Sequence, residues 1–127
     1  MAPVIYLDTH VAIALHTDVS LLGKRARQLL QKEAAIGISP AALLEMQFLH
    51  EIGRIKHPPR SVIRHLQEAL DLQICRKDFV EIISLAGDLS WARDPFDRII
   101  VAHAKLDYDW LVTKDTIIQT NYKRAVW

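Results

Sequence analysis

Two aspartates stand at the ends of short apolar runs, where function gathers in open α/β sheets. Asp8 directly follows Val4-Ile5-Tyr6-Leu7, and Asp115 comes two residues after Trp110-Leu111-Val112-Thr113. Short uninterrupted apolar runs are typical of buried parallel strands, and ligands bind at the carboxyl ends of such strands. A single aspartate at such a place often caps a helix or a turn. Two of them at one edge of one sheet favour a functional site.

A third carboxylate, Glu45, lies in an apolar stretch. The pattern predicts a helix over residues 40–53, on which the positions three, four and seven residues from Glu45 are apolar. They are Ala41, Ala42, Phe48, Leu49 and Ile52. A carboxylate in the middle of this stripe must stay neutral or meet a cation, because an unpaired buried charge is costly. That cation is either part of a functional site or a nearby Lys or Arg, unless Glu45 reaches water at the edge of the stripe.

The segment Asp94-Pro95-Phe96-Asp97-Arg98 contributes two acids, three residues apart, at a predicted helix start. Asp94 is placed to be the N-cap, and Pro95 then occupies the first helical position, where proline is favoured. Asp97 lies in the first turn, where the helix dipole favours an acid. Its side chain also borders the apolar stripe that follows. Capping therefore accounts for Asp94 and leaves Asp97 as a candidate functional residue.

Four acids are thus predicted at one end of a small sheet, without a comparable basic cluster to offset them. They are Asp8, Glu45, Asp97 and Asp115. Mg²⁺ or Mn²⁺ offsets such a cluster, since hard divalent cations prefer oxygen ligands. Carboxylates that hold metal ions beside an attacking water are the usual equipment for hydrolysing phosphodiesters.

Other chemistries have little support in the sequence. The four glycines are scattered and form no phosphate-binding loop. The six histidines show neither His-x-x-x-His nor Glu-x-x-His spacing, and we interpret each as a surface or packing residue. Cys75 lies in an apolar run, where an inert thiol is expected.

The framework that positions these side chains alternates strands with helices. The pattern predicts strands at residues 4–7, 36–38, 72–75 and 110–113. It predicts a short helix over 10–16, one capped by Ser20, one from Ser39-Pro40 to about Gly53, one capped by Ser61, one opened by Asp78 and one from Asp94-Pro95 through Leu106. Strands separated by helices imply a parallel sheet covered on both faces, so we expect an α/β three-layer sandwich.

Length and composition narrow the class of protein. The 127 residues predict a single domain over 1–127, and the 50% of them that are apolar exclude an intrinsically disordered chain. The net charge of +1 excludes a strongly basic nucleic-acid coat, and one cysteine excludes a disulfide scaffold. No apolar run has the length of a membrane span, and the N-terminus lacks the basic region of a signal peptide. We therefore expect a cytoplasmic protein without membrane contact.

The acids stand in four segments of the chain. These are Tyr6-Leu7-Asp8-Thr9-His10, Ser39-Pro40-Ala41-Ala42-Leu43-Leu44-Glu45, Arg93-Asp94-Pro95-Phe96-Asp97-Arg98 followed by Ile100-Val101-Ala102-His103-Ala104, and Leu111-Val112-Thr113-Lys114-Asp115. In this order and spacing they resemble the PIN-domain ribonucleases, and within them the VapC-type toxins of bacterial and archaeal toxin–antitoxin pairs. The resemblance covers essentially the whole chain. It departs at Trp91-Ala92, which precede Arg93 where a histidine often stands.

The resemblance implies a metal-dependent endoribonuclease of a type II toxin–antitoxin system. Its Mg²⁺ or Mn²⁺ would be held by Asp8, Glu45, Asp97 and Asp115. It also implies an RNA substrate, a homodimer, and a cognate antitoxin whose tail occupies the acidic site. All four acids are present, which argues against an inactive copy.

Supporting residues follow from the same motifs. Thr113 matches a small hydroxyl residue that often stands beside the last acid, and Asp94 belongs to the motif of Asp97 and could assist through water. Basic side chains near the motifs are candidate phosphate contacts. They are Arg93, Arg98, Lys114 and Lys123.

Two other classes of function stay open. A haloacid-dehalogenase-like or receiver-like phosphoryl-transfer domain also places an aspartate after its first strand. However, His10 stands where the dehalogenase type needs a second aspartate, and the adjacent acid pair of a receiver is missing at the first strand. The remaining alternative is a non-catalytic binding module that uses the PIN fold as a scaffold.

Overall fold

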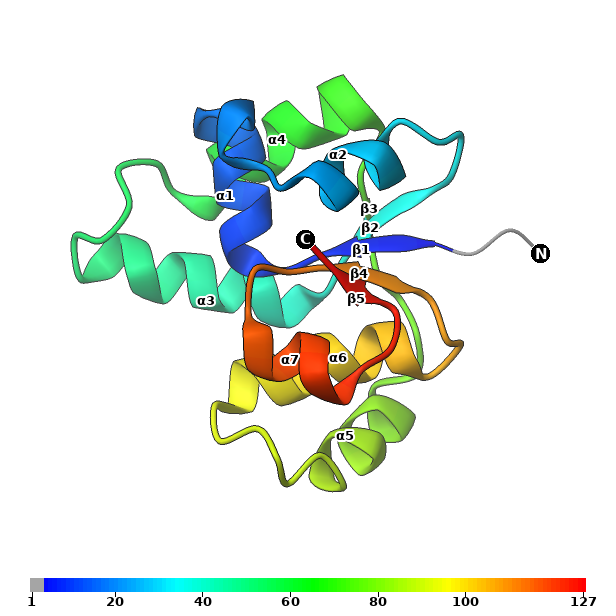
Figure 1. The fold of residues 1–127 in the computed structure, drawn as a ribbon. Helices are drawn as coiled ribbons and strands as arrows, with labels where there is room; N and C mark the ends of the chain where they lie inside the picture. Colours follow the sequence, from blue (N-terminus) through cyan, green and yellow to red (C-terminus); the bar gives the residue numbers. More distant parts are fainter. Residues whose placement is uncertain (1–3) are drawn as a thin grey trace.

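The centre of the molecule is a five-stranded parallel sheet with strand order β3-β2-β1-β4-β5 (Figure 1). The computed structural model describes residues 4–127, so residues 1–3 of the predicted domain lie outside it. The strands are β1 Ile5–Leu7, β2 Ile36–Ile38, β3 Gln73–Ile74, β4 Trp110–Val112 and β5 Ala125–Val126. Leu7 pairs with Ile38 on one side and with Val112 on the other. The residues that follow these three strands therefore start level at one edge of the sheet.

Helices cover both faces of the sheet, which confirms the predicted three-layer α/β fold (Figure 1). One layer contains α1 Thr9–Thr17, α2 Lys24–Leu30 and α4 Pro59–Leu70, with a short 3₁₀ turn, η1 Val19–Leu21, between α1 and α2. The other layer contains α5 Phe79–Gly87, α6 Pro95–Lys105 and α7 Thr116–Asn121. The remaining helix, α3 Pro40–Glu51, contacts α1 and α4 as well as α6. It therefore connects the two layers beside the carboxyl edge of the sheet. No helix within residues 4–127 has both the length and the apolar character to cross a bilayer.

Two predicted helix starts are wrong. Ser20 lies in η1, where Asp18 accepts hydrogen bonds from the Ser20 amide and hydroxyl at 3.0 and 2.6 Å, and α2 begins only after Gly23. Ser61 lies inside α4, which begins at Pro59. In each place an earlier residue starts the turn or helix. Aspartate caps as well as serine does, and the fixed φ of proline suits the first helical position.

Two elements were not predicted, α7 and β5. Of the six residues of α7 only Ile118 is buried, and β5 has two residues, so neither produces a periodic pattern. The prediction for 72–75 shortens to the two residues of β3. Predicted helix ends near Gly53 and Leu106 move to Glu51 and Lys105.

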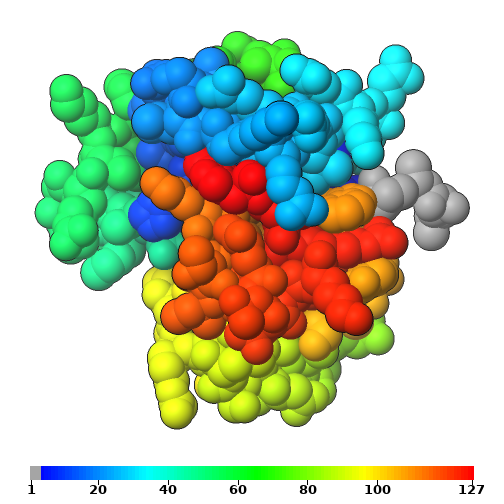
Figure 2. Space-filling model, viewed as in Figure 1, coloured from blue at the N-terminus to red at the C-terminus, as the bar shows by residue number. Residues whose placement is uncertain are grey.

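The C-terminal segment packs against the α1–α2 layer. Figure 2 shows it, in red, between the blue residues of that layer and the orange residues near α7. A Cβ atom on Gly23 would lie 2.6 Å from the backbone of Trp127. A glycine is therefore required before α2, because any side chain there would displace the end of the chain.

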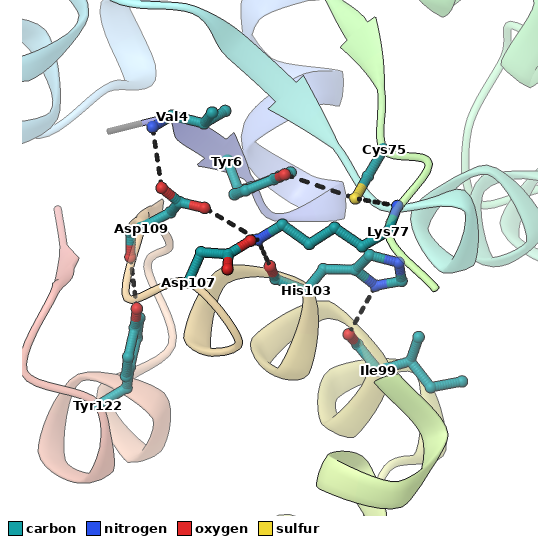
Figure 3. Close-up of polar contacts among 9 residues, drawn as sticks. All are labelled: Val4, Tyr6, Cys75, Lys77, Ile99, His103, Asp107, Asp109 and Tyr122. Atoms are coloured by element: carbon teal, nitrogen blue, oxygen red, sulfur yellow. Dashed lines mark hydrogen bonds and ion pairs between the residues drawn. The ribbon is translucent and has the colours of Figure 1, made fainter. Parts of the chain in front are cut away.

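A buried ion pair ties the amino-terminal ends of β1 and β4 to the rest of the fold (Figure 3). Lys77 Nζ lies 2.9 Å from Asp109 Oδ2 and 3.0 Å from Asp107 Oδ2. The other carboxylate oxygen of Asp109 accepts a hydrogen bond from the Val4 amide at 3.0 Å. The backbone carbonyl of Asp109 accepts a hydrogen bond from the Tyr122 hydroxyl. We call this group the Lys77 junction. It gives the buried carboxylate of Asp109 both a cation and hydrogen-bond donors.

Candidate active site

Asp8 stands at the carboxyl end of β1 and is the N-cap of α1. Only 7% of the residue is exposed. One carboxylate oxygen accepts the Thr9 amide at 2.7 Å, and the other accepts the Thr113 hydroxyl at 2.6 Å. Burial raises the pKa of Asp8, while these two hydrogen bonds oppose the rise. Because Thr113 directly follows β4, the two strand ends together hold this carboxylate at the centre of the edge.

Glu45 projects from the second turn of α3 to the same edge. The hydroxyl of Thr9, a fully buried residue, donates a hydrogen bond to the Glu45 carboxylate. Burial raises the pKa of Glu45, and the negative charge of Asp8 raises it further. Within residues 4–127 the only ion pairs are those of Lys77, so a salt bridge does not account for Glu45.

The other acids of the motifs begin helices. Asp115 caps α7, and its carboxylate accepts two backbone amides at 2.8 and 3.1 Å. Asp94 caps α6 by accepting the amides of Phe96 and Asp97 at 2.7 and 3.4 Å, as predicted. Asp97 follows in the first turn of α6. The backbone amide of Asp97 donates to the capping carboxylate of Asp94, and its own side chain forms no part of the cap.

All four acids predicted to bind metal line one open hollow of about 350 Å³, which we call the acid hollow. Its lining residues are Asp8, His10, Glu45, Asp94, Asp97, Lys114 and Asp115. Among the described residues that line it, Lys114 is the only Lys or Arg. Five carboxylates therefore share one lysine and one imidazole, and the hollow carries a strong excess of negative charge.

Negative charge is most crowded at Asp97. Burial and the charges of Asp8, Asp94, Glu45 and Asp115 together raise the pKa of Asp97 to about 7. Such a carboxyl is about half protonated near neutral pH. A cation in the hollow would favour its ionised form and relieve the repulsion. This is the electrostatic condition under which a carboxylate cluster binds a divalent ion.

The donor set of the acid hollow fits a hard divalent cation, which prefers carboxylate and hydroxyl oxygens. Within residues 4–127, however, no three His, Cys, Asp or Glu side chains are arranged to hold a metal ion as they stand. The case for a metal site therefore rests on the chemistry of the four carboxylates and on the hollow that they share.

The structure also places Thr9 against Glu45 and His10 in the lining of the acid hollow, and neither role was predicted. Thr9 orients Glu45 through its hydroxyl, and His10, exposed as predicted, also lines the hollow. The sequence could have indicated both residues, because they directly follow Asp8 at the end of the first strand, where the site was expected. The spacing rules for histidines did not detect His10, since its neighbours in space come from distant segments.

The predicted phosphate contacts differ in position. Lys114 lines the acid hollow, whereas Arg93 and Arg98 are not among its lining residues. Arg98 donates from Nε to the Ala92 carbonyl at 2.7 Å and so closes the loop before α6. Arg93 and Lys123 are exposed. Only Lys114 of the four is placed to meet a ligand in the hollow.

The sequence model of the PIN domain family matches residues 5–123. The chain belongs to the PIN domain family. This membership leaves the dehalogenase-like and receiver-like alternatives without support. No curated protein sequence matches this PIN domain.

Solved structures share the fold of this PIN domain over nearly its whole length. VapBC2 from Rickettsia felis, bound to a DNA fragment from its promoter, has a TM-score of 0.71 at 18% identity and covers 98% of this chain and 97% of that chain. A toxin–antitoxin complex from Klebsiella pneumoniae has a TM-score of 0.66 at 20% identity, and the match covers 97% of this chain and 96% of that chain. VapBC-1 from nontypeable Haemophilus influenzae has a TM-score of 0.65 at 14% identity, over 98% and 96%. At these identities the likeness establishes the fold.

Proposed function

We propose that the chain is a metal-dependent endoribonuclease that hydrolyses RNA phosphodiester bonds and acts in the cytoplasm as the toxin of a type II toxin–antitoxin pair. The main support is the acid hollow, where four predicted ligands gather with too little positive charge to neutralise them. Solved structures with this fold include toxin–antitoxin complexes. Mg²⁺ or Mn²⁺ suits such a set of oxygen ligands.

In the proposed reaction the carboxylates of the acid hollow would hold the metal ion, which would bind the scissile phosphodiester. A bound divalent ion lowers the pKa of a water molecule and stabilises charge on the phosphate. Thr113 and the Thr9 amide orient Asp8, and the Thr9 hydroxyl orients Glu45, so both carboxylates are held before substrate arrives. Lys114 supplies a positive charge that can meet a phosphate oxygen.

The proposal includes a homodimer and a cognate antitoxin. The apolar stripe predicted to bury Glu45 is divided: Ala41 and Ala42 are buried, whereas Phe48 and Ile52 are 51% and 52% exposed. Leu44, next to Glu45 on α3, is 62% exposed. Glu45 therefore borders an outward-facing apolar surface of α3, and surfaces of this kind are typical of protein–protein contacts. Light scattering of the purified chain tests the dimer. Loss of cleavage on addition of the co-expressed antitoxin tests the partner.

Sequencing of RNA 5′ ends after brief expression tests the activity. We expect new ends at discrete positions with the wild-type chain and none with Asp8→Asn. Purified protein with Mn²⁺ should reproduce the same cuts. Equal cleavage by both variants would point to a contaminating nuclease and contradict the site. If neither cleaves although both fold and bind Mn²⁺, the non-catalytic binding module is the better description.

A further inference from the structure

Positive charge is concentrated in one helical layer of the fold. Residues 9–32 and 52–70, which form α1, α2, α4 and their connections, carry eight of the sixteen Lys and Arg but only two of the fifteen Asp and Glu. The rest of the chain has eight basic and thirteen acidic residues. The total of +1 therefore conceals a basic layer and an acidic remainder.

The basic layer has a dense part that begins after α3 and continues along α4. No Asp or Glu occurs between Glu51 and Glu68. Every basic or imidazole side chain in that interval is exposed, and none forms an ion pair, since the ion pairs within residues 4–127 involve only Lys77. We call this group, together with His16 of α1, the basic patch. It consists of His16, Arg54, Lys56, His57, Arg60, Arg64 and His65.

Three histidines from separate segments meet within the basic patch. His16 Nδ1 lies 2.9 Å from His65 Nδ1, and the ring of His57 stands edge-on to that of His16 with centroids 5.1 Å apart. A hollow of about 230 Å³ beside them is lined by His16 and His57 together with Arg54 and Lys56, and by no acid of the described chain. The basic patch thus has a recess whose polar lining is largely cationic or imidazole.

The electrostatics of this recess indicate an anionic ligand rather than a metal cation. Burial lowers the pKa of His16, and the neighbouring imidazoles of His65 and His57 lower it further, so added positive charge is disfavoured there. Arg54 and Lys56 would repel a metal ion at the same place. A phosphate group would instead relieve the repulsion among these side chains.

We propose that the basic patch binds the phosphodiester backbone of the RNA strand that enters the acid hollow. Helix α1 connects the two places, because Asp8 caps its first turn and His16 lies in its last. Its nine residues span about 13 Å, which a stacked strand covers in roughly four nucleotides. The inference rests on the proposed function, and it assigns the surface that holds the substrate outside the hollow.

The composition of the basic patch favours RNA over an acidic peptide. Arginine and lysine contact phosphates, and the planes of histidine rings offer stacking surfaces for unpaired bases. An acidic peptide would use the cations and the imidazole N–H donors, but it has no bases to stack on the histidine rings. Competition between RNA and polyglutamate for the wild-type chain separates the two ligands, and equal competition would contradict the choice of RNA.

The test measures binding of a short, fluorescein-labelled single-stranded RNA to the full chain by anisotropy, in EDTA and over a series of salt concentrations. The variant Arg60→Gln/Arg64→Gln removes two exposed charges of the patch from α4. Each lost phosphate contact lowers the salt slope by about 0.7, so the pair should weaken binding roughly 10- to 30-fold near 0.1 M salt. The matched control, Arg76→Gln/Lys105→Gln, removes two exposed charges outside the patch and the hollow and should bind nearly as the wild type does.

Equal losses in both double variants would reveal general charge attraction and overturn the proposal, as would unchanged binding by the patch variant. Asp8→Asn, which removes a negative charge from the hollow, should bind RNA at least as tightly as the wild type does while losing cleavage, which separates this inference from the proposed activity. The patch variant should cleave a dinucleotide, too short to reach the patch, with unchanged kcat. It should show a raised KM for longer RNA. If the wild type binds RNA through the patch but cleaves none, the proposed activity fails and the binding surface stands.

Discussion

The acid hollow and the Lys77 junction place buried aspartates in opposite electrostatic environments. Asp109 in the junction is 5% exposed and has a lysine nitrogen 2.9 Å away. Asp8 in the hollow is buried to a similar degree, yet its partners are a hydroxyl and an amide rather than a cation. Nearby, the pKa of Asp97 rises to about 7 through burial and the surrounding carboxylates.

The difference separates a buried charge that is neutralised within the chain from a cluster of charges that is not. A carboxylate that is paired within the chain contributes to folding, and its removal from the pair leaves an uncompensated charge. A cluster of carboxylates that lacks its counter-charge destabilises the free protein and can be satisfied only by a ligand. In the junction Lys77 neutralises the charge of Asp109, whereas the carboxylates of the hollow have no comparable cation to neutralise them.

The largest expected effect is the loss of cleavage in Asp97→Asn. Removing this carboxylate deletes a proposed metal ligand from the hollow, so the Mn²⁺-dependent cleavage rate should fall by at least about 10²- to 10³-fold. The melting temperature without metal should hold or rise, because repulsion among the acids is relieved. Asp88→Asn, an exposed aspartate outside the hollow, is the control. Full activity of Asp97→Asn at matched purity would contradict the assignment of the hollow as the active site.

The junction should respond in the opposite way. Lys77→Met strands the buried carboxylate of Asp109, and we expect the free energy of unfolding to fall by about 3–5 kcal/mol. Urea denaturation of this variant is compared with that of Lys123→Met, which alters an exposed lysine. A cost no greater than in the Lys123 control would show that the junction does not stabilise the fold through its charge pair.

The pH dependence of stability should come from the hollow. The pKa of Asp97 is raised from 3.8 to about 7, so between these values the folded state holds a proton that the unfolded state has lost. The contribution of this group to stability therefore falls as pH rises through that window and is smallest above pH 7. Without metal, thermal melts of the wild type should show lower stability near pH 8 than near pH 6, with a smaller difference in Asp97→Asn. If the melting temperatures of the two proteins changed equally with pH, Asp97 would not be the carboxyl with the raised pKa.

The smallest expected effect distinguishes the two acids at the start of α6, of which Asp94 caps the helix and Asp97 is proposed to bind the metal. Asp94→Ala removes the cap of α6 and should cost about 1 kcal/mol, whereas Asp94→Ser keeps a capping oxygen and most of the activity. Asp97→Ser should abolish cleavage with little change in stability. Cleavage rates and melting temperatures of the three variants decide the point. Because Asp94 also lines the hollow, inactivity of Asp94→Ser would mean that it serves the metal site as well.

Sequence reasoning succeeded where the physical cause is local. Apolar runs followed by aspartate predicted β1 and β4 with Asp8 and Asp115 at their ends, and Ser39-Pro40 predicted the start of α3. The predictions failed where several capping residues lie close together. Ser20 was predicted as an N-cap, but Asp18, two residues earlier, is the residue that caps the turn. Elements of two or six residues, such as β5 and α7, are too short to show a period.

Glu45 lies at the predicted edge of the sheet, although part of the reasoning that placed it there was wrong. The sequence predicted that apolar residues bury it, but Phe48 and Ile52 on its helix are half exposed. Glu45 is partly buried, with the Thr9 hydroxyl bonded to its carboxylate, and it lines the acid hollow. Amphipathic spacing predicts that residues share a face of a helix, and packing decides whether that face meets the core or the solvent.

The sequence by itself determined four of the five strands, several helix caps and the presence of acids at strand ends, because each depends on neighbours a few positions away. Only the tertiary structure decided which charges are neutralised. Lys77 meets Asp109 from 32 residues away, and Thr113 meets Asp8 from 105 residues away. Electrostatic energy depends on distance through space and on burial, and neither is set by spacing along the chain. The fold therefore turned one aspartate into half of a structural ion pair and left four other acids with a charge that a metal ion can satisfy.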